Sequence, residues 1–171
     1  TSIGNYVFYG CENLQSITIP DSVTSIGNYA FYGCENLQNI TIPDSITFMG
    51  EGTFCYCDSL TSVSIGKGIT TIEDETFYAC ENLQNITIPD SVTSIGYAAF
   101  YKCESLTNIT IPDSMISIEN SAFSGCSSLT SITIPASVTS IGDYVFQDCD
   151  NLTNISVNSN NPNYSSMDGV L

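Results

Sequence analysis

The sequence of 171 residues contains no histidine and no arginine, and it has only two lysines. Histidine is the commonest general base and metal ligand, and arginine is the side chain that grips phosphates through two hydrogen bonds. Without them, the chain lacks the side chains that hydrolases, metalloenzymes and phosphate-binding proteins most often use. We therefore expect no enzyme activity, no cofactor and no metal site.

Positive charge is scarce, because 18 acidic residues against two lysines give a formal net charge of −16. Nucleic acids and anionic membranes bind basic surfaces, which displace their counterions, so neither is an expected partner. No apolar run approaches the roughly 20 residues of a membrane-spanning helix, so we expect no direct membrane insertion. Thr1 lies in the middle of a sequence repeat, so we expect the chain to be a piece of a longer protein.

A unit of 23 residues recurs along the chain without insertion or deletion. Cysteine follows the same spacing from Cys11 to Cys149, and leucine follows it from Leu14 to Leu152. Such a fixed period is typical of stacked repeats, in which each unit contacts mainly its neighbours. The period is set most clearly by phenylalanine, at Phe8, Phe31, Phe54, Phe77, Phe100, Phe123 and Phe146.

One repeat predicts the local structure of all of them. Residues 83–88 end in an apolar and polar alternation, which indicates a strand with one face buried. Pro89 ends this strand and begins a Pro-Asp-Ser turn. A second short alternation follows at residues 92–95. Residues 97–103 are too short for an independent helix, so we interpret them as a helical or 3₁₀ turn.

These elements predict a mostly β, α/β-type repeat solenoid with about seven coils over residues 1–157. Residues 158–171 depart from the repeat and are expected to close or interrupt the array. Each coil should point eight side chains inward. In the second full repeat these are Ala30, Phe31, Cys34, Leu37, Ile40, Ile42, Ile46 and Met49.

The pattern L-x-x-I-x-I-P-x-S-V-x-x-I-x-x-x-A-F-x-x-C covers almost the whole chain and resembles the leucine-rich repeats of BspA-like surface proteins of bacteria and protists. This resemblance implies a right-handed superhelix with a parallel sheet on one face and the short turns on the convex side. It also implies a location at the cell surface and adhesion to other proteins, and it supplies no catalytic residues.

Seven of the eight cysteines occupy one core position per coil, where they are expected to be reduced and unreactive. Stacked neighbours near the ~4.8 Å strand spacing have parallel side chains, whereas a disulfide needs converging Cβ atoms ~3.8 Å apart. Cys55 differs, because it occupies a position that carries tyrosine in other coils. We expect Cys55 to lie outside the core and to be the one accessible thiol.

The acidic residues also recur with the repeat, in one column from Glu12 to Asp150 and another from Asp21 to Asp113. Neighbours in a column approach the ~5–5.5 Å separation of a retaining glycosidase pair, but the repeat produces that spacing automatically. We interpret the columns as a solvated acidic face. Weak binding of a divalent cation is the alternative.

Three groups of residues are candidates for binding. The tyrosines of the connecting segment have rigid rings with a polar tip, although the same rings could simply cover the core. Phe48 replaces serine or threonine and is either drift or an exposed anchor. The outward strand residues form the surface that leucine-rich repeats usually use. The candidates are Tyr9, Tyr32, Tyr78, Tyr101, Phe48, Asn85, Thr87, Asn108 and Thr110.

The function favoured by these features is a non-enzymatic, extracellular binding or adhesion module on a cell surface. Its expected partner is a protein or a glycan. The alternative is a structural spacer that holds another domain away from the surface, which the even repeats and the small polar strand residues also fit.

Overall fold

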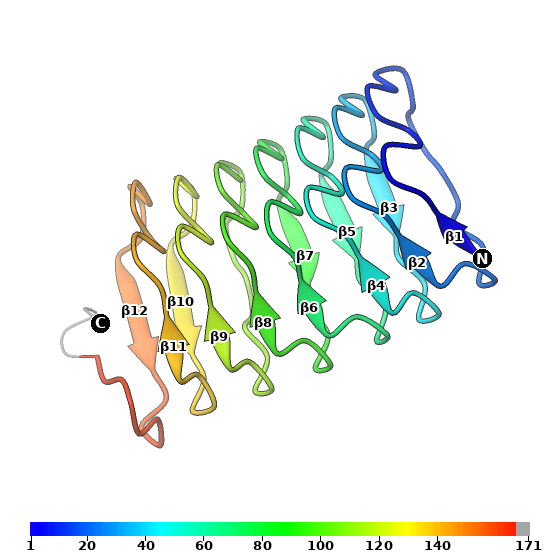
Figure 1. Ribbon diagram of the computed structural model, residues 1–171. Helices are drawn as coiled ribbons and strands as arrows, with labels where there is room; N and C mark the ends of the chain where they lie inside the picture. Colours follow the sequence, from blue (N-terminus) through cyan, green and yellow to red (C-terminus); the bar gives the residue numbers. More distant parts are fainter. Residues whose placement is uncertain (167–171) are drawn as a thin grey trace.

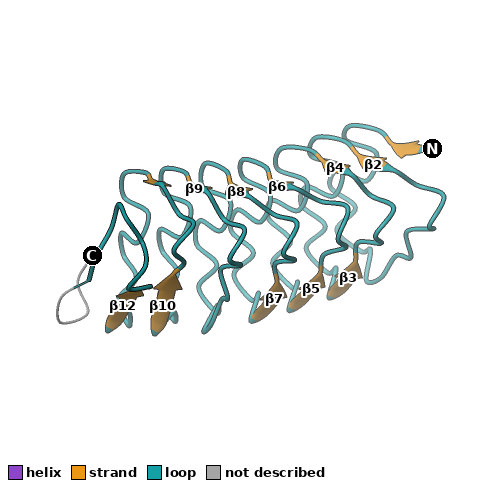
Figure 2. Ribbon diagram, turned by 90° about the horizontal axis from the view of Figure 1, so that it is seen from below, coloured by secondary structure: helices purple, strands orange, loops and turns teal. Residues whose placement is uncertain are grey.

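Each repeat forms one coil of a solenoid, and the coils stack in chain order along the body (Figure 1). The structure is a computed structural model and describes residues 1–166. Its strands form two rows on opposite sides of the body (Figure 2). The row of longer strands contains β3 (Asn39–Thr41), β5 (Ser62–Ser64), β7 (Asn85–Thr87), β10 (Ser131–Ile134) and β12 (Asn154–Val157). The row of two-residue strands contains β1 (Ser2–Ile3), β2 (Ser25–Ile26), β4 (Phe48–Met49), β6 (Thr71–Ile72), β8 (Ser94–Ile95), β9 (Ser117–Ile118) and β11 (Ser140–Ile141).

Every paired strand runs parallel to its neighbour, with a register of one repeat. Asn39 of β3 pairs with Ser62 of β5, which pairs with Asn85 of β7. In the row of two-residue strands, Ser94 pairs with Ser117. Because the register equals the sequence period, each column of the repeat becomes a line of like side chains along the solenoid.

Each row is interrupted once between its first and last strand within residues 1–166, and the interruptions fall at different coils. The row of two-residue strands breaks between β4 and β6, and the row of longer strands breaks between β7 and β10. Residues 108–110 of the coil between β7 and β10 form no strand. At each interruption the opposite row is continuous, so the coils stay joined.

The core fills the space between the two rows, and the predicted inward positions are confirmed. All eight predicted side chains of the second full repeat are buried, and none is more than 4% exposed. The phenylalanine rings from Phe8 to Phe146 form a continuous stack, with centroids 5.0–6.0 Å apart and planes within 16° of parallel. Each such pair adds about 0.5–1.5 kcal/mol beyond the burial of its area.

The expected helical or 3₁₀ turns were wrong, because residues 1–166 contain neither type of helix. Alternate N–H groups of each segment donate to the next coil, as from Phe77 to the Ala99 carbonyl at 2.8 Å and from Ala79 to the Tyr101 carbonyl at 2.7 Å. The N–H groups between these donate to the carbonyl three residues earlier in the chain, as from Tyr78 to Glu75. In a helix all these N–H groups would donate to carbonyls of the same segment. The segment is instead a series of tight turns, and its bonds to the next coil add a third line of hydrogen bonds between coils.

Two positions of each turn segment have a left-handed backbone, which also excludes a helix. One column contains Tyr29 at φ 53°, and glycine fills it in the next coil as Gly52 at φ 58°. The other contains Gly33 and, in the next coil, Tyr56 at φ 57°. The members with positive φ are Tyr6, Tyr29, Gly52, Glu75, Ala98, Ser121 and Tyr144 in the first column, and Gly10, Gly33, Tyr56, Ala79, Lys102, Gly125 and Asp148 in the second.

The non-repeat C-terminal segment folds back onto the last coils over residues 158–166. The Asn161 side-chain amide donates to the backbone carbonyls of Pro135 and Val138, at 2.8 and 3.0 Å. The Tyr164 hydroxyl accepts a hydrogen bond from the Ile141 N–H at 2.9 Å. Residues 167–171 of the expected closing element lie outside the described residues.

Candidate functional site

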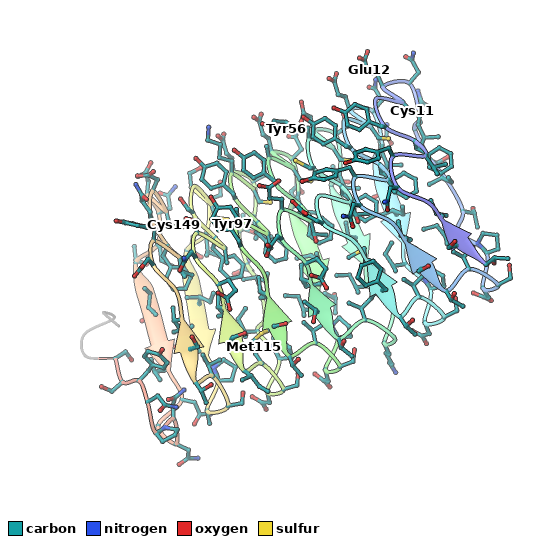
Figure 3. All side chains as sticks on the ribbon, in the orientation of Figure 1. Cys11, Glu12, Tyr56, Tyr97, Met115 and Cys149 are labelled. Carbon is teal, nitrogen blue, oxygen red and sulfur yellow. The ribbon has the colours of Figure 1, made fainter. Side chains whose placement is uncertain are left out.

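The largest group of exposed aromatic side chains is a stripe along the edge formed by the turn segments. Its seven rings contact one another, with centroid distances from 4.6 to 6.1 Å. Figure 3 shows Tyr56 along the same edge as Glu12. We call this set the tyrosine stripe, and it consists of Tyr6, Tyr9, Tyr29, Tyr32, Tyr56, Tyr78 and Tyr101.

The stripe brings together all four tyrosines predicted from the sequence. Tyr9 is 53% exposed, whereas Tyr32, Tyr78 and Tyr101 are half-buried because each is covered by a ring from a neighbouring coil. Tyr9 stacks on Tyr32 at 4.6 Å and Tyr78 stacks on Tyr101 at 4.8 Å. The rings therefore both cover the core and present their edges and hydroxyls to solvent.

Acidic side chains line the stripe and bond to it. The Tyr29 hydroxyl donates a hydrogen bond of 2.6 Å to Glu51, and this bond, with burial, raises the pKa of Tyr29 far above its ordinary value. Burial and the neighbouring rings raise the pKa of Tyr78 to about 12. Both phenols therefore keep their protons at any physiological pH.

Cys55 is a correction to the sequence prediction, because it is buried and only 3% exposed. The ring of Tyr56, one residue later, takes the place in the stripe that Cys55 leaves. It lies 5.4 Å from Tyr32 and 5.5 Å from Tyr78 and so continues the stripe between these two rings. Burial, with a contribution from Glu75, raises the pKa of Cys55 to about 12.

The cysteines of the repeat are free thiols, and five of the seven are buried as predicted. Each buried thiol donates to the phenylalanine carbonyl of the preceding coil, as from Cys80 to Phe54 at 3.1 Å. Cys149 is half-buried, and Cys11 is exposed. The expected order is thus reversed, since Cys11 is the accessible thiol and Cys55 is not.

Phe48 lies on β4 and is 48% exposed, so its predicted exposure is confirmed. It pairs with Ser25 of β2 on one side. On the other side, the ladder between β4 and β6 is interrupted in the described structure. Phe48 therefore marks the break in the row of two-residue strands, and its role in binding stays a prediction.

The predicted strand residues fall into two groups. Asn85 and Thr87 are exposed on β7, whereas Asn108 and Thr110 are exposed in the coil that lacks a longer strand. All four belong to one face of the body, but the face carries no aromatic side chain at these columns. Their binding role also stays a prediction.

A groove on the opposite edge was missed by the sequence reasoning. It has a volume of about 760 Å³ and crosses three coils, with Pro43, Lys67 and Pro89 among its lining residues. A Cβ on Gly66 would lie 2.5 Å from the Pro43 carbonyl, so this turn packs closer to the preceding coil than a larger residue allows. The signal was the replacement of Pro-Asp-Ser by Gly66-Lys67-Gly68.

The acidic column that begins at Glu12 runs beside the stripe, three residues after the tyrosine column in each coil. Burial raises the pKa of Asp58, and repulsion from Glu81 and Glu35 raises it further. Within residues 1–166, no group of three or more His, Cys, Asp or Glu side chains is placed to hold a metal ion. The described part of the chain also contains no helix able to cross a membrane.

Comparison with models of known protein families identifies the family to which this repeat belongs. The model of the BspA type leucine rich repeat region matches residues 1–100 and 70–167, in six copies. The chain belongs to the BspA-type leucine-rich repeat family. No curated protein matches it.

Solved structures of bacterial leucine-rich repeat proteins share the fold of this BspA-type chain. A leucine rich cell surface protein from Faecalibacterium prausnitzii is 37% identical, with a TM-score of 0.83 over 99% of this chain and 45% of the other. A leucine-rich repeat protein from Bacteroides ovatus is 35% identical, with a TM-score of 0.81 over 90% of this chain and 39% of the other. The T. pallidum leucine-rich repeat protein is 29% identical, with a TM-score of 0.83 over 90% and 72%.

The BspA-type chain therefore spans less than half the length of the F. prausnitzii and B. ovatus proteins.

Proposed function

We propose that this chain is a non-enzymatic binding module on the outside of a cell, where it holds a protein or glycan partner. The observation that carries the proposal is the tyrosine stripe, a continuous line of seven contacting aromatic rings that are all exposed or half-buried. Tyrosine is favoured in binding surfaces because its ring is rigid and its hydroxyl forms hydrogen bonds. The cell-surface setting is supported by the F. prausnitzii relative.

A catalytic role has less support. The chain has no histidine, and its carboxylates lie in evenly spaced columns along open edges. An enzyme site usually combines a concave pocket with titratable groups in mutual contact. The groove beside Lys67 is lined mainly by proline, glycine, serine, threonine and aliphatic side chains, with Asp44 and Asp90 at its rim.

The second candidate function is a structural spacer. The evenness of the coils favours it, because like residues pair from coil to coil and the longer strands expose only small polar side chains. Such a body separates two domains by a fixed distance without contacting either partner.

One experiment separates the two functions. The chain is immobilised, extracellular-matrix proteins and glycans are passed over it, and binding is measured by surface plasmon resonance. We expect saturable binding that is lost when Tyr9, Tyr56 and Tyr101 are changed to serine. Absence of saturable binding to every ligand tested would favour the spacer.

The same measurement locates the binding face. A variant with Asn85 and Thr87 changed to alanine keeps the stripe intact and alters only the strand face. We expect this variant to bind as the natural chain does. Loss of binding in this variant, with retention in the tyrosine variant, would move the site to the strands.

A further inference from the structure

Not every ring of the stripe is stacked on its neighbours, so some ring faces are open to a partner. Tyr56 is tilted by 64° to Tyr32 and by 55° to Tyr78, and it is 42% exposed. A ring tilted to both neighbours is stacked on neither face. Tyr6 and Tyr9 are 55% and 53% exposed and are tilted by 57° to each other. The stripe thus has open aromatic surface at its middle and near its start.

The chain itself shows what such a ring attracts. The ammonium group of Lys102 lies 5.6 Å from the centroid of the Tyr101 ring, at the end of the stripe. A cation within about 6 Å of a ring centroid is attracted by the negative charge of the ring face. The contact is an internal example of a cation bound to this surface.

Negative charge lies next to the same rings. The acidic column from Glu12 follows the tyrosine column, and Glu51 bonds to Tyr29 within the stripe. Asp58 repels its column neighbours Glu81 and Glu35, and of the two lysines only Lys102 belongs to this edge, since Lys67 lies on the opposite one. A bound cation would relieve this repulsion, which gives the surface a strong preference for positive charge.

We propose that the tyrosine stripe and the acidic residues beside it form a docking surface for a lysine- or arginine-rich polypeptide segment. This inference rests on the proposed function and names the class of its partner. Basic side chains lie against the open ring faces while their charges pair with the flanking carboxylates. Phenol hydroxyls on the exposed edges accept hydrogen bonds from the same cationic groups.

The length of the stripe favours a polypeptide over a single ion. Five coils from Tyr9 to Tyr101, at the ~4.8 Å strand spacing, extend over roughly 20 Å. An extended polypeptide covers that length with about six residues, at about 3.3 Å each. Alternate residues of such a segment face the same way, so three basic side chains reach the stripe at once.

The test uses a fluorescein-labelled octalysine peptide and measures fluorescence anisotropy against the chain. The control peptide carries acetylated lysines, which keep the length and remove the charge. We expect saturable binding of octalysine at 150 mM salt, at least tenfold tighter than that of the acetylated peptide, and weaker binding at 500 mM salt.

The variants separate the rings from general charge attraction. Changing Tyr56 to asparagine, which tolerates its positive φ, and Tyr9 to serine is expected to weaken binding about two- to fivefold for each ring. The matched control is Tyr144→Asn, an exposed tyrosine of positive φ outside the stripe, and its affinity should change less than twofold. Lys102→Met removes the internal cation and should strengthen binding.

Two outcomes would overturn the inference. If the stripe variants and Tyr144→Asn bind octalysine equally well, the peptide is held by net charge alone and the stripe is not the docking surface. If octalysine does not bind at 150 mM salt while the same preparation captures a matrix protein or glycan, the basic partner is wrong and the proposed function stands. Failure of both measurements would reject both.

Discussion

Two lines of aromatic rings run side by side through the molecule, one buried and one exposed. The buried line has a phenylalanine in every coil, and all its rings are nearly parallel. The exposed line occupies the next position of the repeat. It contains cysteine at Cys55 and gives way to serine at Ser124 and glutamine at Gln147.

The contrast between the buried line and the exposed line shows which positions of the repeat the fold requires. A missing ring in the buried line would leave a cavity, because the neighbouring coils cannot close over the lost volume. The exposed line tolerates the loss of a ring, since cysteine at Cys55 and serine at Ser124 take its place and are both only 3% exposed. The buried line is therefore fixed by packing, whereas the exposed line is free to be shaped by a partner.

The largest expected effect comes from breaking the buried line. Phe77 is fully buried, and Phe77→Ala should lower the free energy of unfolding by about 3–5 kcal/mol. The measurement is a urea melt followed by circular dichroism. A loss below about 1 kcal/mol would contradict the packing of the ring. Leu83→Ala, at another fully buried position, should cost about 2–5 kcal/mol.

Alkaline pH should destabilise the core that the phenylalanine line shares with the thiols. Burial raises the pKa of Cys34 from 9.0 to about 11 and that of Cys55 to about 12. Unfolded thiols lose their protons near pH 9 while folded thiols keep them, so the unfolded state binds fewer protons and the free energy of unfolding falls. The stabilising contribution is complete below pH 8 and is lost as the pH rises through 9 to 12.

Urea melts between pH 7 and 11 test this dependence. Cys55→Ala should reduce the alkaline decline. A flat profile up to pH 11 in the natural chain would show that the thiols are as accessible in the folded state as in the unfolded one.

A smaller effect is expected from breaking the exposed line next to the same phenylalanine. Tyr78→Ala removes two ring contacts, to Tyr56 and Tyr101, and should cost about 1–2 kcal/mol. The cost must stay below that of Phe77→Ala in a urea melt under the same conditions. Equal costs would mean that both lines serve packing alone.

The last prediction has the smallest effect on stability, because it concerns the chemical labelling of thiols in the natural chain and involves no mutation. A maleimide reagent at pH 7.5 should label Cys11 first and leave Cys55 unlabelled until urea is added. Mass spectrometry after digestion identifies the labelled positions. Rapid labelling of Cys55 in the folded chain would contradict its burial.

The sequence was sufficient to predict the core and insufficient to predict the turns. Period and alternation identified every inward position of the second full repeat. The left-handed positions of the turn segment were visible only where glycine occupies them, at Gly10, Gly33, Gly52 and Gly125, and the other coils carry non-glycine residues there. The sequence alone therefore favoured a short helix.

The candidate surface was predicted in part for a similar reason. Column membership placed Tyr9 and Tyr32 correctly along one line, since register equals period. It could not place Cys55, because a tyrosine at this position keeps part of its ring in solvent whereas the smaller thiol is buried. The groove at Gly66 depends on how closely two coils approach, and the replacement of Pro-Asp-Ser by Gly66-Lys67-Gly68 was the only sign of it in the sequence.

The hydrogen bonds between coils have a mechanical consequence. They run along the long axis of the body, in the two strand rows and in the turn segments, as from Phe77 to Ala99. A force that pulls the two ends apart therefore stretches them directly and opens the stack one coil at a time. Each opened coil releases 23 residues, on the order of 75 Å of extended chain. A body built this way yields in steps under tension, and the coils that remain closed keep their stacking.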